Sequence, residues 1–198
     1  MTVEIAVLGW GSLIWRPTHC DTTLELRHPG HWEPDGPTIP IEFARISRDG
    51  SLTLVVVPEY PHIVTTLWSM SAHQTLDPAI RNLAARECIT ENLNSIHGVG
   101  RDGSIIGSSN EEIATTVESW LGDQEDSLGA AIWTGLGTQP RRWRDRGYRE
   151  GFTQANALSY LRSLQADENH PAFEYIRRTP EQIMTPIRKQ QAYEEGLL

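Results

Sequence analysis

A glycine-containing loop near the amino end is the first feature of this sequence that could do chemistry. Gly9-Trp10-Gly11-Ser12-Leu13 directly follows an apolar, β-branched stretch over residues 3–8. Glycine allows successive backbone N–H groups to point at one centre, and such a loop can bind a carboxylate or stabilise an oxyanion. A tight turn whose glycines serve only packing is the alternative. The position at the end of a predicted buried strand favours the anion-binding interpretation.

The second feature is a carboxylate on a predicted helix. Asp77-Pro78 is typical of a helix start, and the apolar residues from position 80 onward follow the spacing i, i+3, i+4. Glu87 falls at i+7, on the face that should pack on the core. Burial disfavours the charged form of a carboxyl group, so Glu87 is a candidate general base. Pairing with Arg86 or Arg81 is the alternative.

A hairpin over residues 41–57 supplies two lesser candidates. Asp49-Gly50 is the dipeptide preferred in a two-residue type I′ turn, and this register places Arg45 opposite Leu54. Arg45 and Ser47 then lie on the mainly apolar face of the hairpin. A guanidinium there would suit a carboxylate-bearing ligand, although a salt bridge to a core acid is equally compatible with the pattern.

The two cysteines and the histidines give weaker signals. Cys20 and Cys88 are too few for a disulfide framework, and reduced thiols are expected. Cys88 adjoins Glu87 and is a candidate nucleophile, a buried and inert thiol being the alternative. The seven histidines show no metal-ligand spacing, since His28 and His31 lack a third ligand nearby. The sequence predicts no metal and no cofactor.

Charge and hydropathy narrow the class of protein. The 198-residue chain has a formal net charge of −9, which argues against nucleic acid and anionic membranes as partners. An acid at Glu4 stands where a secretory signal would carry bases, and no apolar run approaches the ~20 residues of a membrane span. A soluble, cytoplasmic protein is expected.

The elements that must position these residues point to an α+β fold. Strand patterns lie mostly in the first half and helix patterns in the second, which favours α+β over a doubly wound α/β sheet. The basic run over 141–146 is interpreted as a solvated loop or helix face. Further strands are expected over 62–71 and 130–135, and further helices over 109–122, over 153–165 and from Pro180.

The two leading motifs together resemble a known family. Gly9-Trp10-Gly11-Ser12-Leu13-Ile14-Trp15 is similar to the Y-G-S-L-I-W loop of γ-glutamylcyclotransferase-like proteins, in particular their glutathione-degrading branch. Leu83-Ala84-Ala85-Arg86-Glu87 resembles the L-x-x-R-E of that branch, whose glutamate is catalytic. Between them, Phe43-Ala44-Arg45-Ile46-Ser47 is similar to its F-x-x-x-S hairpin and Thr66-Leu67-Trp68-Ser69-Met70 to a V-W-G-type strand.

The resemblance covers residues 5–87 and has several departures, among them the absence of the family's glycine-tyrosine stretch after Glu87. Trp10 replaces a tyrosine, and Glu42 stands where an arginine precedes the phenylalanine. It implies an α+β fold built as a small mixed β-barrel flanked by helices. It also implies a single domain over 1–198, with 140–198 as a helical C-terminal extension.

The implied reaction converts a γ-glutamyl amide to 5-oxoproline and releases the amine. Glu87 would be the general acid/base, with no metal and no cofactor, and the partner would be a small γ-glutamyl molecule. A non-catalytic small-ligand-binding protein on the same fold and a Cys88-dependent amidase are the alternatives. The residues implied to bind substrate are Gly9, Trp10, Gly11, Ser12, Leu13, Arg45 and Ser47.

Overall fold

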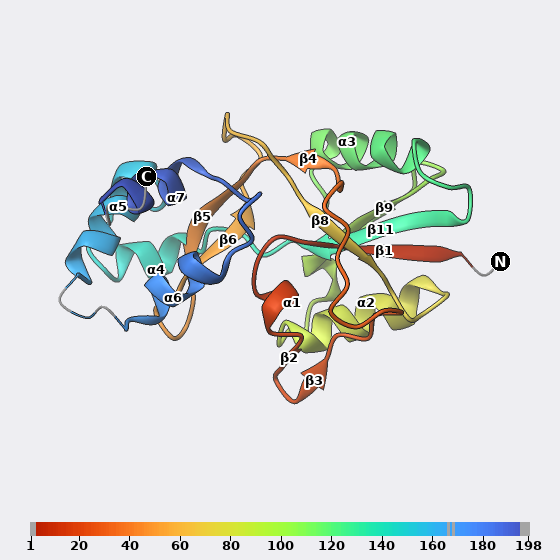
Figure 1. Cartoon of the computed structure of the whole chain (residues 1–198), viewed down its shortest axis with the longest axis horizontal. Coiled ribbons are helices and arrows are strands. Elements are labelled where there is room, and N and C mark those ends of the chain that lie inside the picture. The colour runs from red at the N-terminus through yellow and green to blue at the C-terminus, as the bar shows by residue number, and fades with distance from the viewer. Residues whose placement is uncertain (1–2, 166, 168, 195–198) are drawn as a thin grey trace. The chain divides into compact units, whose positions relative to one another are not determined.

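The computed structural model describes residues 3–165, 167 and 169–194, and the chain forms two compact units (Figure 1). The first unit comprises Met1–Ile39 and Thr65–Leu136, and the second comprises Pro40–Val64 and Gly137–Leu198. Compact units are not by themselves independently folding domains. The single domain over 1–198 with an extension from 140 therefore stays a prediction.

A five-stranded mixed sheet forms the centre of the first unit, in the order β10-β9-β11-β1-β8. The central strands β1 and β11 run parallel, and every other neighbouring pair is antiparallel. Within the described residues the outer strands β10 and β8 do not pair with each other, so the sheet is open and no closed barrel is observed. The strands are β1 (Glu4–Gly9), β8 (Leu67–Met70), β9 (Ile96–Gly100), β10 (Ile105–Ile106) and β11 (Leu128–Thr134).

Two helices pack on this sheet, α2 (Leu76–Arg86) and α3 (Glu111–Gly122). They lie on opposite sides of it (Figure 1). Strand β1 is buried along almost its whole length, as its continuous apolar run requires. The core on the α2 side joins Ile5 and Val7 of β1 to Leu83 and Ala84 of α2. The α+β class predicted from the sequence is confirmed.

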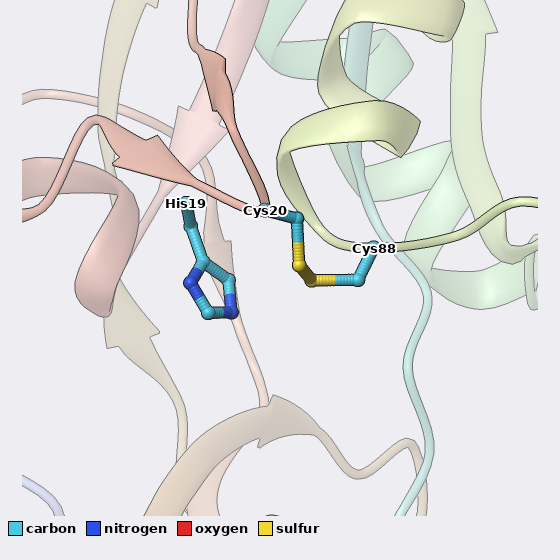
Figure 2. A group of neighbouring side chains, drawn as sticks. All are labelled: His19, Cys20 and Cys88. Carbon is cyan, nitrogen blue, oxygen red and sulfur yellow. A yellow bond between two sulfur atoms is a disulfide. The ribbon is translucent and has the colours of Figure 1, made fainter.

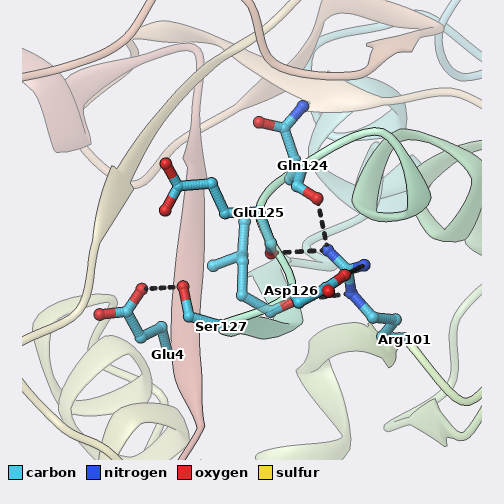
Figure 3. Close-up of polar contacts among 7 residues, drawn as sticks. Glu4, Arg101, Gln124, Glu125, Asp126 and Ser127 are labelled. Atoms are coloured by element: carbon cyan, nitrogen blue, oxygen red, sulfur yellow. Dashed lines mark hydrogen bonds and ion pairs between the residues drawn. The ribbon is translucent and has the colours of Figure 1, made fainter.

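The loop before β11 is fixed by one arginine (Figure 3). Arg101 donates from Nη2 to the carbonyl oxygens of Gln124 and Glu125, at 2.9 and 2.7 Å, and from Nε to that of Leu128, at 3.0 Å. Ser127 Oγ donates to Glu4 Oε2 at 2.7 Å. These bonds hold the start of β11 beside β1, which stabilises the parallel pairing at the centre of the sheet.

Short elements connect the sheet and helices of the first unit. Asn82 of α2 ties the helix to the adjoining small hairpin, since its Nδ2 donates to Thr23 O at 2.9 Å and its Oδ1 accepts from Glu25 N at 2.8 Å. The short elements are α1 (Ser12–Trp15), β2 (Thr18–His19), β3 (Thr22–Thr23), β4 (Thr38–Ile39), β7 (Val64–Thr65) and the 3₁₀ turn η1 (Leu93–Ser95).

The second unit is a β-hairpin with helices, organised around Trp143. The indole is fully buried, and its Nε1 donates to Ala44 O at 3.0 Å and Thr138 O at 3.1 Å. The predicted solvated face is confirmed for Arg141, Arg144 and Arg146, which are exposed around this tryptophan. The elements are β5 (Ile41–Ile46), β6 (Leu52–Val56), α4 (Pro140–Arg144), α5 (Gln154–Ser163), α6 (Pro171–Arg178) and α7 (Pro186–Glu194).

The predicted register of the β5–β6 hairpin is wrong. An irregularity between Phe43 and Arg45 shifts the pairing of Phe43, which lies opposite Leu54, whereas the pairing of Arg45 with Thr53 is set by the turn. The turn is also longer than the expected two residues: Gly50 N donates to Ser47 O at 3.2 Å and only Gly50 of the turn has positive φ, at +88°. This is a three-residue loop ending in a left-handed glycine.

Several other expected elements are confirmed with shifted bounds. The strand over 130–135 is β11, and the helices over 109–122 and 153–165 are α3 and α5. Strand β9 was missed because it carries two glycines. A Cβ at Gly98 would lie 2.6 Å from Ala131 O, so the close approach of β9 to β11 requires glycine there. In the described part of the chain, no helix has the length and apolarity that a membrane crossing requires.

Candidate functional site

Glu87 lies at the end of helix α2. Cys88 N donates to Ala85 O at 3.1 Å and Ile89 N to Ala84 O at 2.8 Å, which is the Schellman pattern of helix termination. Cys88 takes the left-handed position of this motif, with φ +59°, where glycine is the usual residue. Glu87 is therefore the cap residue of the helix, and its side chain is 15% exposed.

Arg86 pairs with Glu87, as the alternative interpretation of the sequence proposed. The guanidinium of Arg86 is 1% exposed, and its Nη1 contacts Glu87 Oε1. Its Nη2 donates to Ser12 Oγ at 3.3 Å and to the carbonyl oxygen of Arg16. Arg81 pairs instead with Asp77, at 2.8 Å. One buried cation thus contacts both the predicted catalytic acid and the predicted glycine loop.

The glycine loop is buried, and one of its glycines serves packing. A Cβ at Gly9 would overlap ring carbons of Trp32, so the packing interpretation is confirmed at that position. Neither Gly9 nor Gly11 has positive φ. After the loop the chain makes the single helical turn α1, in which Ile14 N donates to Gly11 O at 3.0 Å. The anion-binding role of the loop stays a prediction.

Arg45 and Ser47 belong to the second unit, whereas Glu87 and the glycine loop belong to the first. Arg45 Nη1 donates to Gly137 O at 2.8 Å, and Ser47 Oγ contacts Asp49 Oδ1. Both side chains therefore have partners within their own unit. A substrate site shared by all the residues that the resemblance implies stays a prediction.

Glu42 is a buried carboxylate that the sequence interpretation missed. It is fully buried and accepts hydrogen bonds from Phe43 N at 2.8 Å and Ile187 N at 3.3 Å. Burial raises the pKa of Glu42, with Thr185 and Tyr60 as further hydrogen-bond partners of the carboxylate. Strand β5 is buried on both faces, so Glu42 is buried together with its neighbour Phe43.

Cys20 and Cys88 form a disulfide (Figure 2), so the expectation of reduced thiols is wrong for this structure. Both cysteines are exposed, so the alternative of a buried thiol is also wrong. Their Cα atoms are 5.7 Å apart across a sequence separation of 68 residues. His19 lies beside the pair: one ring nitrogen and the two sulfur atoms all lie within 4.8 Å of one another. Sequence spacing gave no sign of this cluster.

A surface hollow of about 560 Å³ lies at the start of helix α3. None of the predicted site residues lines it. Its lining residues are Asn110, Glu111, Glu112, Thr115 and Thr116.

Comparisons with known proteins give no assignment. No protein-family model, curated protein or solved structure matches the chain. The function is therefore argued from the residues and their contacts.

Proposed function

We propose that this protein is a γ-glutamylcyclotransferase-like enzyme, which converts a γ-glutamyl amide to 5-oxoproline and releases the amine. The observation that supports the proposal is the position of the buried Arg86 guanidinium. It contacts the Glu87 carboxylate and donates to Ser12 Oγ, although Ser12 and Arg86 are 74 positions apart. The end of α2 and the glycine loop thus meet through one side chain.

In the proposed reaction, the free α-amine of the substrate attacks its own γ-carbonyl carbon. A new C–N bond closes the five-membered ring, and the original amide C–N bond breaks. Glu87 takes the proton from the attacking amine and passes it to the leaving nitrogen. Because the nucleophile is tethered to its target, orientation contributes much of the rate enhancement. Backbone N–H groups of residues 9–13 would stabilise the carboxylate or the oxyanion.

Membership of this family is part of the same proposal. The order of a buried strand, a glycine loop, a hairpin, a strand and a helix ending at Glu87 supports it. The proposed site comprises this glutamate and the loop over 9–13, both in the first unit. The substrate is a small γ-glutamyl molecule, and the setting is the cytoplasm.

A non-catalytic protein that binds a small amino-acid-like ligand is the second candidate. The observation that favours it is the ion pair itself, since the Glu87 carboxylate already has a structural partner in Arg86. The Cys88-dependent amidase needs a free thiol, whereas Cys88 is bonded to Cys20 in this structure.

A panel of γ-glutamyl amides tests the proposal, with 5-oxoproline as the measured product and a thermal-shift screen of the same compounds. Wild type should release 5-oxoproline from at least one compound. Glu87→Gln should lower kcat by about 10²-fold or more while keeping the fold, although the loss of the ion-pair partner of the buried Arg86 should lower the melting temperature. Asp77→Asn, at an exposed acid of the same helix, is the matched control. Ligand-induced stabilisation without product would favour the binding protein, and full activity of Glu87→Gln would rule out the proposed mechanism.

A further inference from the structure

The geometry points to a second site, in which His19, Cys20 and Cys88 bind a zinc ion once the disulfide is reduced. This inference does not rest on the proposed function. Thiolates and imidazole are the ligands that Zn²⁺ prefers, and three protein ligands with one open position is a common zinc arrangement. All three donor atoms already lie within 4.8 Å of one another.

The separation of the two cysteines is compatible with a disulfide and with two thiolates on one zinc ion. Two sulfur ligands at about 2.3 Å from a tetrahedral zinc lie about 3.8 Å from each other. The Cα atoms of Cys20 and Cys88, 5.7 Å apart, allow this sulfur separation through a small rotation of each side chain. His19 directly precedes Cys20 in the chain, so its ring approaches the same point from the same hairpin (Figure 2).

The cluster stays assembled when the disulfide opens, because other contacts hold its two parts together. Asn82 makes two hydrogen bonds from α2 to the backbone of residues 23 and 25. Leu24 and Leu26, which follow the hairpin, pack in the same core as Leu83 of α2. The turn that carries Cys20 is thus fixed against the helix that Cys88 terminates, and reduction leaves two thiols facing each other.

The backbone at both cysteines also indicates a role for the side chains. Cys20 and Asp21 form a two-residue turn between β2 and β3, with φ of +48° and +56°. Cys88 has φ of +59°. Residues other than glycine pay about 1 kcal/mol or more for this conformation. Local backbone preference therefore does not select cysteine at either position, and the paired sulfur chemistry offsets this cost.

Reduction of the disulfide has to precede metal binding. A dithiol reductant gives two electrons and two protons to the Cys20–Cys88 bond, the S–S bond breaks, and the reductant becomes a disulfide. Zn²⁺ then displaces the two thiol protons to solvent and binds both thiolates and a ring nitrogen of His19. A disulfide oxidant would take two electrons from the thiolates and become a dithiol, which re-forms the Cys20–Cys88 bond and releases the zinc ion. The cluster is exposed on two of its three residues, so both reductant and metal can reach it.

Cobalt substitution tests this inference on the full-length protein. The protein is reduced with dithiothreitol, desalted anaerobically and titrated with Co²⁺, followed by Zn²⁺. Reduced wild type should show thiolate-to-cobalt charge transfer and the visible bands of tetrahedral cobalt, saturating at one ion per chain and lost when zinc is added. The disulfide form should show neither signal.

Variants identify the ligands. Cys20→Ser and Cys88→Ser should abolish the charge-transfer band or reduce it to that of a single thiolate. His19→Gln should weaken metal binding by more than about tenfold. His31→Gln, at an exposed histidine that pairs with Glu33, should bind like wild type.

Three results would overturn the inference. These are no thiolate–cobalt band in reduced wild type, equal binding by the disulfide form, and unchanged affinity in His19→Gln. The first two comparisons use the wild-type protein, so they stand even if a variant does not fold.

Discussion

The guanidinium of Arg86 donates to the carbonyl oxygen of Arg16, a residue 70 positions earlier in the chain. The same side chain contacts Glu87 and Ser12 and is almost completely buried. A buried charge is tolerated only when it is paired and hydrogen-bonded, and these three contacts provide that compensation. Arg86 therefore positions the chain after the glycine loop relative to the end of α2.

Replacing Arg86 by methionine should destabilise the first unit by about 2–4 kcal/mol, because Glu87 and the Arg16 carbonyl each lose a charged donor. Urea-induced unfolding followed by circular dichroism measures the loss. Arg81→Met removes an exposed i,i+4 pair on the same helix and should cost less than about 1 kcal/mol. Equal effects of the two substitutions would contradict the structural role assigned to Arg86.

Gly9→Ala should be destabilising by about 1–3 kcal/mol, because the new methyl group would overlap the ring of Trp32. Removal of that ring in Trp32→Ala should make the same substitution nearly neutral, which a double-mutant cycle in urea measures directly. At Gly122 a Cβ meets nothing within 4 Å, so Gly122→Ala should be neutral or slightly stabilising. A coupling energy near zero between positions 9 and 32 would refute the packing argument.

The buried carboxyl group of Glu42 makes stability depend on pH. Burial raises the pKa of Glu42, so the native state binds more protons than the unfolded chain, where the pKa is about 4.3. The contribution of this group is complete below about pH 4.3 and is lost as pH rises through the higher native value. A glutamine at position 42 stays neutral, so the variant does not lose this stability as the pH rises. The free energy of unfolding of Glu42→Gln minus that of wild type should therefore increase from pH 4 to pH 8.

Denaturant titrations of both proteins across this range check the prediction. Other titrating groups are the same in the two proteins, so they cancel in the difference. Parallel stability curves would show that the Glu42 carboxyl is not shifted upward in the native state.

Trp143→Ala should cost about 3–5 kcal/mol, because it removes a fully buried ring and leaves two backbone carbonyl oxygens without their shared donor. The ring also contacts Tyr148, Phe152 and Tyr160, with centroid separations of 5.7, 6.0 and 6.2 Å. Tyr193→Ala removes an aromatic ring that is 70% exposed and should change stability by less than about 0.5 kcal/mol. Thermal unfolding of the three proteins distinguishes these outcomes.

Local signals in the sequence predicted the elements that depend on local chemistry. Asn110 and Thr153 cap α3 and α5, as polar residues before apolar periodic segments do. Likewise, continuous apolar runs predicted the buried strands β1 and β11. The predicted β5–β6 register is wrong because the loop has three residues where Asp49-Gly50 indicated two, and because the irregularity after Phe43 depends on tertiary packing.

The site residues also differ in whether local patterns or long-range contacts determine their positions. Local periodicity predicted that Glu87 lies on the core face of a helix, and its pairing with Arg86 was one of the recognised alternatives. The contact of Arg86 with Ser12 and the meeting of Cys20 with Cys88 join segments 74 and 68 residues apart. Such contacts depend on the path of the whole chain, and the spacing of residues within one motif does not report that path.

The path of the chain also limits how the protein can be divided. The β5–β6 hairpin is encoded between two halves of the first unit, while the helices that cover it come after residue 136. A fragment ending at Leu136 would keep the hairpin and lose Trp143, Tyr160 and Ile187, so Phe43 and Leu52 would face solvent. Shortened versions for expression should therefore remove the hairpin together with the carboxyl-terminal helices, bridging Ile39 to Thr65. Removing the helices alone leaves an aggregation-prone apolar strand pair, and removing the hairpin alone uncovers the apolar faces of the helices.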